Sequence, residues 1–390
     1  MKKQKNIEPL PFYVYYLVVL VVAAVGLSDA VYLSISHYQV YTDIGYKSFC
    51  AVSKAINCDT VSQSAYSILL NVPVPIWGVL GYMIFLALLY QAWRFRLEKK
   101  YFWPTLFFIA FGFCLYSIVL ALISSLIIKA YCIMCILSYG VNFVLLFYCW
   151  LIHKRFEKES IFKGLKSDLR LYSKQWKKIA GYAVTLVVLT VTLSVAFPDY
   201  WNMELDFTDA HIPSGLTNDG HPWIGAEKPE LTIIEFSDYQ CFQCKKMHLY
   251  LRQLIVQHPD KIRLIHRHFP MDHSVNPIVK DPFHIGSGKL SLLALFALEK
   301  GKFWEVNDLL FNLDNEKETL SIRKIAAAVD FDVLPFAGSI HHPYLQHKLK
   351  VDILTGIKLG VTGTPGFLID DKIYLGEIPA DLLAGFKLER

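Results

Sequence analysis

The sequence predicts a membrane-embedded all-α helical bundle followed by an α/β domain outside the membrane. The chain of 390 residues is 54% hydrophobic and only 19% charged, and its mean hydropathy of +0.35 is too high for an ordinary soluble domain or a disordered chain. The two halves also differ in charge. Residues 1–197 contain 19 Lys and Arg against 8 Asp and Glu, whereas residues 198–390 contain 20 against 26. A basic apolar half joined to an acidic half argues against nucleic-acid binding and fits a membrane domain that carries a soluble one.

Five segments have the roughly 20 apolar residues that a membrane span needs. They are residues 12–36, 74–92, 103–127, 131–152 and 179–197. The first is too long for a signal peptide, and no small-residue cleavage site follows it. Sixteen Lys and Arg lie on one side of the predicted spans and three on the other. This bias places the N-terminus in the cytoplasm and everything after Pro198 outside.

These spans predict four regions along the chain. Residues 1–152 form a four-helix membrane domain, and residues 153–197 form a cytoplasmic loop and the fifth span. Residues 198–229 are rich in Pro, Gly, Asp and Asn and predict a linker. Residues 230–390 form the α/β domain, in which helical patterns between 286 and 355 predict a helical insert.

Six of the eight cysteines fall on the predicted outer side as three pairs. These pairs are Cys50 with Cys58, Cys132 with Cys135, and Cys241 with Cys244. Thiol pairs on one face of a membrane predict a relay, because disulfide exchange passes electrons through mixed disulfides. The remaining Cys114 and Cys149 lie within spans and are interpreted as small buried hydrophobic residues.

The soluble pair forms a C-x-x-C motif between a strand pattern, residues 231–236, and a helical pattern that reaches residue 256. At a helix start the first cysteine faces unpaired backbone N–H groups, which favour its thiolate. The alternative is a zinc site completed by histidines. No second cysteine pair follows in this domain, so we predict redox chemistry and no metal. His266, Arg267 and His268 end a strand pattern near this motif and are interpreted as solvated surface residues.

The pair Cys132 and Cys135 begins a helix that enters lipid, where it can meet a membrane-soluble oxidant. Lys129 either favours the thiolate or extends to the interface. An inert packing pair here, and a simple structural disulfide between Cys50 and Cys58, are the alternatives. Asp29 lies late in the first span, where an ionisable group is a candidate for function or for a structural hydrogen bond.

Several segments together resemble a known family. Cys50, Cys58, Asp59-Thr-Val-Ser62, Pro73-Val-Pro-Ile-Trp-Gly78 and Cys132-Ile-Met-Cys135 resemble bacterial homologues of vitamin K epoxide reductase. Cys241-Phe-Gln-Cys244 and Val361-Thr-Gly-Thr-Pro-Gly366 resemble a thioredoxin-fold, DsbA-like domain fused to it. The second segment resembles the cis-proline loop of that fold, with Thr364 before Pro365. The resemblance covers roughly residues 10–152 and 228–388.

The resemblance implies a membrane thiol oxidase that generates protein disulfides. Four spans would surround a quinone (ubiquinone, or menaquinone or phylloquinone), and a fifth would tether the thioredoxin-like domain. Cys241 would attack and Cys244 resolve, with Thr364 and Pro365 as the substrate-thiol loop. Cys50 would exchange with the soluble domain and Cys58 with Cys132, and Cys135 would face the quinone.

The same resemblance implies the quinone contacts. Tyr139, one turn beyond Cys135, would hydrogen-bond a quinone carbonyl, although an aromatic core residue is the alternative. Trp77 would stack near the ring or belong to the interfacial aromatic belt. Ser62 leads an amphipathic stretch that would cover the quinone or pack on the bundle. Val74 stands where the animal enzymes carry an asparagine, which leaves the second carbonyl donor unassigned and disfavours epoxide reduction in the strict sense.

The expected location is a bacterial inner membrane, with the N-terminus in the cytoplasm and the thioredoxin-like domain in the periplasm. The expected partners are reduced extracytoplasmic client proteins, the membrane quinone pool and the lipid bilayer, with no nucleic acid. The alternatives are a vitamin K epoxide or quinone reductase and a disulfide reductase or isomerase of chaperone type. The absence of a cysteine pair on the predicted cytoplasmic side argues against export of electrons.

Overall fold

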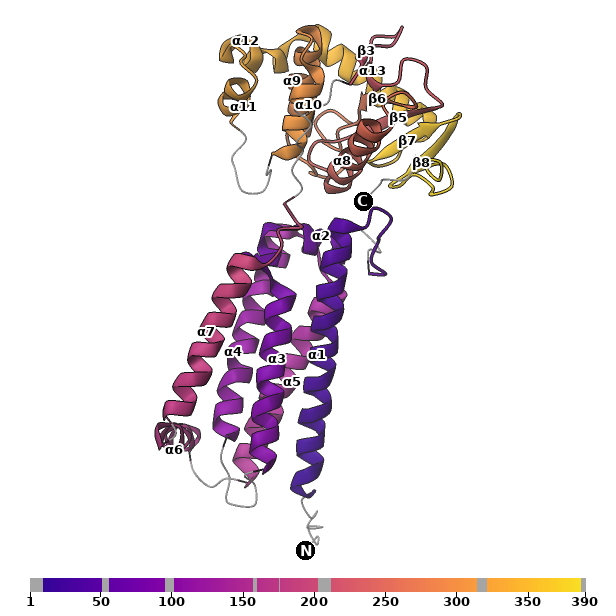
Figure 1. Cartoon of the computed structure of the whole chain (residues 1–390). Coiled ribbons are helices and arrows are strands. Elements are labelled where there is room, and N and C mark those ends of the chain that lie inside the picture. The colour runs from indigo at the N-terminus through magenta and orange to yellow at the C-terminus, as the bar shows by residue number, and fades with distance from the viewer. Residues whose placement is uncertain are drawn as a thin grey trace, which may run out of the picture. The chain divides into compact units, whose positions relative to one another are not determined.

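The computed structural model describes residues 10–50, 56–94, 102–156, 160–174, 176–202, 212–313 and 321–386. The chain divides into two compact units, Met1–Tyr200 and Trp201–Arg390 (Figure 1). The first contains the long apolar helices and the second contains the large sheet.

The membrane unit is built around four long helices that run side by side (Figure 1). They are α1 (Phe12–Thr42), α3 (Val74–Arg94), α4 (Trp103–Ile123, extended by the π-helical segment η3, Ser124–Ile128) and α5 (Ile133–Phe156). Among the described residues, these four are long and apolar enough to cross a membrane. The predicted four-helix membrane bundle is therefore confirmed.

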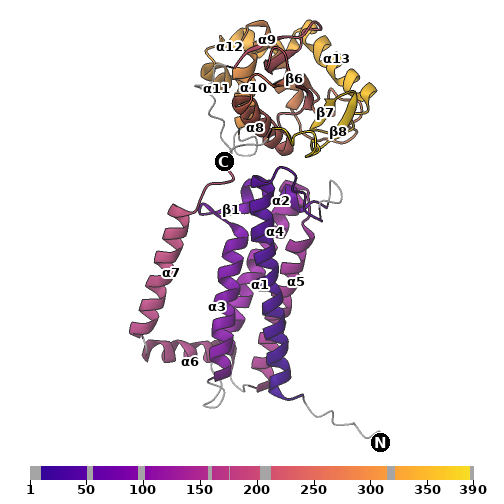
Figure 2. The same ribbon diagram turned by 45° about the vertical axis from the view of Figure 1, so that its right-hand side comes forward.

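Two further helices follow the bundle. Figure 2 shows α6 (Ile161–Lys174) running across its end and α7 (Trp176–Ala196) standing outside the four long helices. The fifth predicted span is thus helical. Within the described residues, the apolar helical stretch in it is Val184–Ala196, and the fifth membrane crossing stays a prediction.

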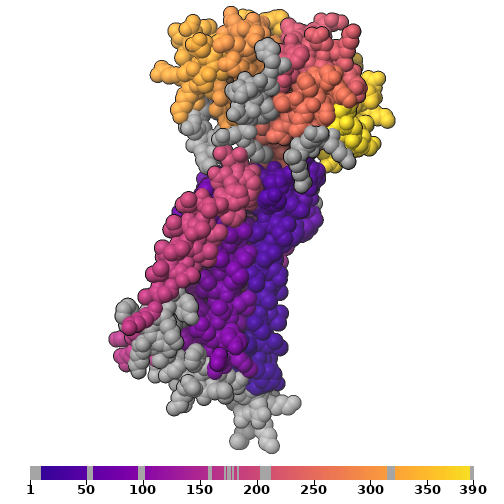
Figure 3. Space-filling view, viewed as in Figure 1, coloured from indigo at the N-terminus to yellow at the C-terminus, as the bar shows by residue number. Residues whose placement is uncertain are grey.

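The interior and the surface of the bundle are both apolar. Val19, Phe85 and Leu145 are fully buried between the helices, whereas Leu17 on α1 is 54% exposed and Phe147 on α5 is 52% exposed. The space-filling view shows α1, in indigo, open along one face of the bundle (Figure 3). Helices that are apolar on all sides suit a lipid environment, where the outer face needs no polar side chains.

A short layer closes one end of the bundle between α1 and α3. It consists of α2 (Cys58–Gln63), the 3-10 turn η1 (Ala65–Ser67) and a hairpin of β1 (Ile68–Leu69) and β2 (Val72–Pro73). The Asn57 side chain caps α2 by accepting hydrogen bonds from the backbone N–H groups of Asp59 and Thr60. Leu70 and Asn71 both have positive φ, 52° and 57°, which is the geometry of a two-residue hairpin turn. This layer is the amphipathic stretch predicted after Ser62.

The second unit is a six-stranded sheet in the order β3-β4-β6-β5-β7-β8. The strands are β3 (Ser214–Leu216), β4 (Pro222–Gly225), β5 (Leu231–Ser237), β6 (Ile262–His268), β7 (Gly366–Ile369) and β8 (Lys372–Leu375). β5 and β6 are parallel, joined through α8 (Phe242–Gln257), and the other neighbours are antiparallel. Parallel neighbours need such a crossover helix.

The helices between β6 and β7 match the predicted insert. They are α9 (Ser287–Glu299), α10 (Phe303–Asn312), α11 (Ile322–Ala328), α12 (Val333–Gly338), the turn η4 (Ser339–His341) and α13 (Pro343–Leu359). Phe236 of β5 and Phe269 after β6 are fully buried and pack edge to face, with ring centroids 6.2 Å apart. Gly356 of α13 lets this helix approach closely, because a Cβ there would lie 2.7 Å from the Phe269 ring. The predicted α/β domain with a helical insert is confirmed.

Candidate functional site: paired cysteines and an apolar cavity

Three of the membrane-unit cysteines lie in one buried cluster. Cys50 and Cys58 are joined by a disulfide with Cα atoms 5.7 Å apart. Cys132 packs in the same cluster, with Cys135 at its edge. The first three are at most 3% exposed. The structure thus brings together the loop pair and the membrane pair, which are more than 70 residues apart in the sequence.

Backbone contacts hold the loop pair beside the membrane pair. Asn57 precedes Cys58 and Tyr131 precedes Cys132. The backbone N–H of Asn57 donates to the carbonyl of Tyr131 at 2.9 Å. Ile56 and Tyr131 form a parallel β-bridge. The two cysteines therefore each follow one side of the same bridge.

The membrane pair has the sulfur environment expected at a helix start. The backbone N–H of Cys135, in the first turn of α5, donates to the Cys132 sulfur at 3.2 Å. Both are free thiols. An N–H aimed at sulfur from the positive end of a helix stabilises a thiolate. Cys114 and Cys149 are free and buried elsewhere in the bundle, as predicted.

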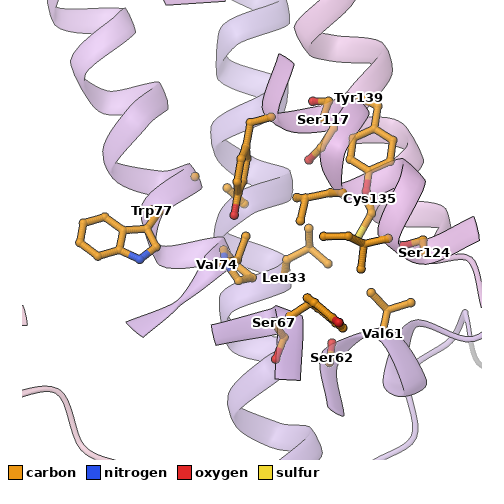
Figure 4. A pocket seen from close by; sticks show the side chains of 18 of the residues that line it. Leu33, Val61, Ser62, Ser67, Val74, Trp77, Ser117, Ser124, Cys135 and Tyr139 are labelled. Atoms are coloured by element: carbon orange, nitrogen blue, oxygen red, sulfur yellow. The ribbon is translucent and has the colours of Figure 1, made fainter. Parts of the chain in front are cut away.

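Cys135 opens onto a cavity of about 270 Å³ inside the bundle. Tyr139, Ser62 and Trp77 also line this cavity. Figure 4 shows Cys135 and Tyr139 on one side, with Val74 across from them and Trp77 at the edge. The indole N–H of Trp77 donates to the carbonyl of Leu69 at 2.9 Å, so this ring also fastens the hairpin to α3.

The cavity wall carries polar residues that the sequence analysis missed. His37, 1% exposed, has its Nδ1 2.8 Å from the Tyr200 hydroxyl and its Nε2 3.1 Å from the Ser67 hydroxyl. The first span was predicted over residues 12–36, and its helix α1 continues beyond it to Thr42 and carries His37. Helix α1 continues beyond its most apolar stretch because the short layer that contains α2 packs against its last turns.

The soluble pair has a second version of the same sulfur geometry. Cys241 is the N-cap of α8, and the backbone N–H of Cys244 donates to its sulfur at 3.2 Å. The Cys241 thiol lies 3.5 Å from the carbonyl of Thr364. The peptide bond between Thr364 and Pro365 is cis. The predicted cis-proline is therefore present, and its loop lies against Cys241.

The two soluble thiols differ in acidity. Burial would raise the pKa of Cys241, but the hydrogen bond from Cys244 and the charge of His284 outweigh it, so that the pKa is lowered. Burial and the neighbouring Cys241 thiolate raise the pKa of Cys244 well above its usual range. Asp238 holds His284 in place through a 2.9 Å contact to Nδ1. This difference suits Cys241 for attack and Cys244 for the resolving step.

The prediction that His266 and His268 are solvated is wrong. Both are 1% exposed, because β6 lies inside the sheet between β4 and β5 and is covered on its faces. His266 Nδ1 contacts Glu235 Oε1 at 2.6 Å, and its Nε2 lies 3.3 Å from His268 Nδ1. Arg267, whose side chain lies on the opposite face of the strand and is 13% exposed, contacts the exposed Asp219 and the buried Asp352.

Further charged groups lie where the C-x-x-C helix α8, which carries His248 and Arg252, packs against Asp308 of α10. His248 Nε2 lies 2.8 Å from Asp308 Oδ1, and Arg252 donates to Asp308 Oδ2 at 2.7 Å. Burial would raise the pKa of Glu235, but the hydrogen bond from His266 and the nearby His248, 3.7 Å away, lower it to about 2. Burial lowers the pKa of His268 well below its usual range. Within the described residues, no group of three or more His, Cys, Asp or Glu side chains is arranged to hold a metal ion.

Two family models match the chain. Residues 17–150 match the one described as "Vitamin K epoxide reductase family", and residues 217–386 match the one described as "Thioredoxin". The predicted resemblance is confirmed by these matches, which fall on the two units separately. The membrane cysteine cluster and the cavity lie mainly in the first match, and the C-x-x-C motif with the cis-proline loop lies in the second.

Curated relatives and solved structures match parts of the chain. Na(+)/H(+) antiporters NhaA from Salinispora tropica and Herminiimonas arsenicoxydans are each 24% identical, over 41% and 40% of this chain. The matched segment spans less than a quarter of the length of these antiporters, 23% of each. A thioredoxin-like oxidoreductase from Silicibacter pomeroyi is 23% identical with a TM-score of 0.36, covering 42% of this chain and 88% of its own. The thiol-disulfide exchange protein alpha-DsbA2 from Wolbachia pipientis is 26% identical with a TM-score of 0.34, covering 42% and 84%.

Proposed function

Because the chain joins a vitamin K epoxide reductase family domain to a thioredoxin domain, we propose that it is a thiol oxidase that makes disulfides in client proteins and passes their electrons to a quinone. The two domains and the four membrane-capable helices make it a membrane oxidoreductase with a disulfide-related function. The electron route, the quinone and the clients are the proposal.

The observation that carries the proposal is the packing of the Cys50–Cys58 disulfide against Cys132, whose partner Cys135 opens onto the cavity. Thiol–disulfide exchange needs a sulfur that can reach a disulfide. In this cluster Cys58 and Cys132 belong to different pairs and share one buried environment. Disulfide exchange between Cys58 and Cys132 can therefore pass electrons between the two pairs without unfolding either helix end.

The route begins in the thioredoxin domain. A client thiolate attacks the oxidised Cys241–Cys244 pair, and a second client thiol completes the client disulfide. The reduced pair then reduces Cys50–Cys58, and that pair reduces Cys132–Cys135. Each exchange breaks one S–S bond and forms another, so two electrons move at each step and the proton count is unchanged. The exchange of Cys241 with Cys50 joins the two units and remains a prediction.

The cavity fits a quinone by the chemistry of its walls. Apolar side chains such as Leu33 and Leu120 surround it, and a few hydroxyls lie among them, which is the usual composition of a pocket for an aromatic ligand. A bound quinone would accept two electrons and two protons. Tyr139 would donate its hydroxyl to one carbonyl, and Ser62 and Trp77 would line the ring. Since Val74 offers no donor, Ser67, whose hydroxyl lies 3.1 Å from His37 Nε2, would be a candidate second donor on the cavity wall.

The proposed location is a bacterial inner membrane with the N-terminus in the cytoplasm and the thioredoxin domain in the periplasm. The distribution of Lys and Arg between the predicted loops supports it. Reduced extracytoplasmic proteins would be the clients. Ubiquinone is a benzoquinone, and menaquinone and phylloquinone are naphthoquinones; all three carry the 1,4-dione that this cavity would hold.

The test is anaerobic stopped-flow of the purified full chain with a reduced client and a short-chain quinone. Client-dependent quinone reduction is expected, and Cys132→Ser or Cys135→Ser should each abolish it. Cys114→Ser, in the same bundle but outside the cysteine cluster, is the matched control and should retain the rate. Full activity in either of the first two variants would overturn the relay.

A further inference from the structure

The bundle contains a buried carboxylate that the relay above does not use. Asp29 of α1 is 3% exposed. Its Oδ2 accepts a hydrogen bond from the Ser138 hydroxyl, and its Oδ1 is buried with no hydrogen-bond partner among the described residues. A half-satisfied carboxylate inside a membrane bundle costs free energy of folding, so its position calls for a functional explanation.

Asp29 is connected to the membrane cysteine pair through one face of α5. Ser138 and Cys135 lie three residues apart on that helix, and both line the cavity. Electrostatic interactions join the Asp29 carboxylate to the thiols of Cys132 and Cys135. The one hydroxyl that holds the carboxylate therefore also faces the space next to the reactive sulfur.

The other groups around Asp29 are neutral or polar. Tyr82 of α3 interacts with Asp29 and Ser138, and its hydroxyl donates to Asn142 Oδ1 at 2.7 Å. Asn142 donates in turn to the Ser117 hydroxyl of α4 at 2.9 Å. Helix α4 contributes two titratable groups here, Cys114, which interacts with Tyr82, and Tyr116, which lines the cavity beside Ser117. In the described part of the bundle, no lysine, arginine or histidine forms an ion pair with Asp29.

The chemistry of the proposed reaction requires a proton carrier at this place. When a dithiol becomes a disulfide, two S–H bonds break, one S–S bond forms and two electrons leave. The acceptor forms two O–H bonds. The lining of the cavity is largely apolar, so few of its side chains can take a proton, and a positioned carboxylate is a common group for this task.

We propose that Asp29 is the proton carrier of the membrane cysteine pair, taking protons from the Cys132 and Cys135 thiols and returning them through the Ser138 hydroxyl to the acceptor in the cavity. This inference rests on the proposed quinone-reducing function. The carboxylate takes up one proton at a time and is restored after each transfer. Two protons and two electrons thus leave the dithiol and reach the quinone, and the net charge of the site is unchanged over the cycle.

The main test compares Asp29→Asn with Asp29→Glu. In single-turnover quinone reduction by the reduced full chain, Asp29→Asn should slow the reaction by roughly 10²-fold and make its rate rise with pH, because solvent must then take the thiol proton. Asp29→Glu keeps a carboxylate and should restore most of the rate. Asp168→Asn is the matched control. Asp168 is also buried, but it bonds the backbone of Phe102 at the other end of α4, so its loss should leave the pH profile unchanged.

A second readout needs no quinone. Infrared difference spectra of the quinone-free chain, recorded across a pH series as the membrane pair is reduced, should show the carbonyl band of a protonated carboxyl in wild type. The band should be absent in Asp29→Asn and present in Asp168→Asn. Ser138→Ala, which removes only a hydroxyl, tests the same route if Asp29→Asn does not fold, and it should slow quinone reduction while keeping the band.

The outcomes separate the two proposals. A wild-type chain that does not reduce quinone refutes the proposed function. A wild-type chain that does reduce it, together with unchanged rate and pH profile in Asp29→Asn or in Ser138→Ala, overturns the role of Asp29. A carboxyl band that persists in Asp29→Asn overturns it as well.

Discussion

The buried carboxylate behind the C-x-x-C helix predicts a specific acid sensitivity of the thioredoxin domain. The pKa of Glu235 falls from its ordinary 4.5 to about 2. One unit of pKa difference between the unfolded and folded states corresponds to about 1.36 kcal/mol, so the lowered pKa of Glu235 stabilises the folded domain by about 3 kcal/mol. Because the pKa is lowered on folding, the stabilisation is fully present above about pH 4.5 and disappears as the pH falls through about 2. Glu235→Gln should therefore cost about 3 kcal/mol at pH 7 and progressively less toward pH 2.

The assay is a urea titration of the full chain at several pH values, with hydrogen exchange of β5 and β6 peptides as the probe of this domain. The matched control is Glu230→Gln, whose carboxylate is exposed and lies 3.7 Å from Lys261; such surface pairs contribute little. A cost of Glu235→Gln that stayed the same from pH 7 to pH 2 would refute the reasoning, because lost packing rather than lost charge would then explain it.

Two further predictions concern the thiols. In the reduced full chain, alkylation should modify Cys241 at a lower pH than an ordinary thiol, because its pKa is lowered. His284→Ala should shift the pH dependence of this alkylation rate to higher pH. A wild-type alkylation rate with the pH dependence of an ordinary thiol would contradict the lowered pKa. Cys135→Ser should accumulate a mixed disulfide between Cys58 and Cys132, since the resolving thiol of the membrane pair is gone. Mass spectrometry of peptides from the oxidised variant would detect this disulfide. Its absence would contradict the exchange between the two pairs.

Much of the fold could be predicted because its signals are local. The four long helices follow from the length of their apolar segments, and the two C-x-x-C pairs follow from their place at helix starts. The cis bond before Pro365 followed from the resemblance of its loop to a known fold. Each of these depends on residues that are close in the sequence or on a motif that fixes its own geometry.

The remainder depends on contacts that no sequence window contains. His266 and His268 are buried because β6 received neighbours on both edges and a helical cover from residues far along the chain. The contact of Asp29 with Ser138 joins positions 109 residues apart. A polar residue in an apolar segment can be noticed in the sequence, but its partner is decided only by which helices pack together.

The two C-x-x-C pairs show how little of a redox role resides in the motif itself. Cys132 and Cys241 each accept a hydrogen bond at 3.2 Å from the backbone N–H three residues later, so the local support of the thiolate is the same. The surroundings differ: Cys241 lies against the carbonyl of Thr364 in the cis-proline loop, whereas Cys135 faces a cavity with a largely apolar lining. The backbone of the cis-proline loop can pair with a client polypeptide and bring its thiol to Cys241. The apolar cavity can hold a small ring but not a polypeptide. In the proposed relay, the position of each pair in the fold, rather than its two intervening residues, would therefore determine its electron-transfer partner.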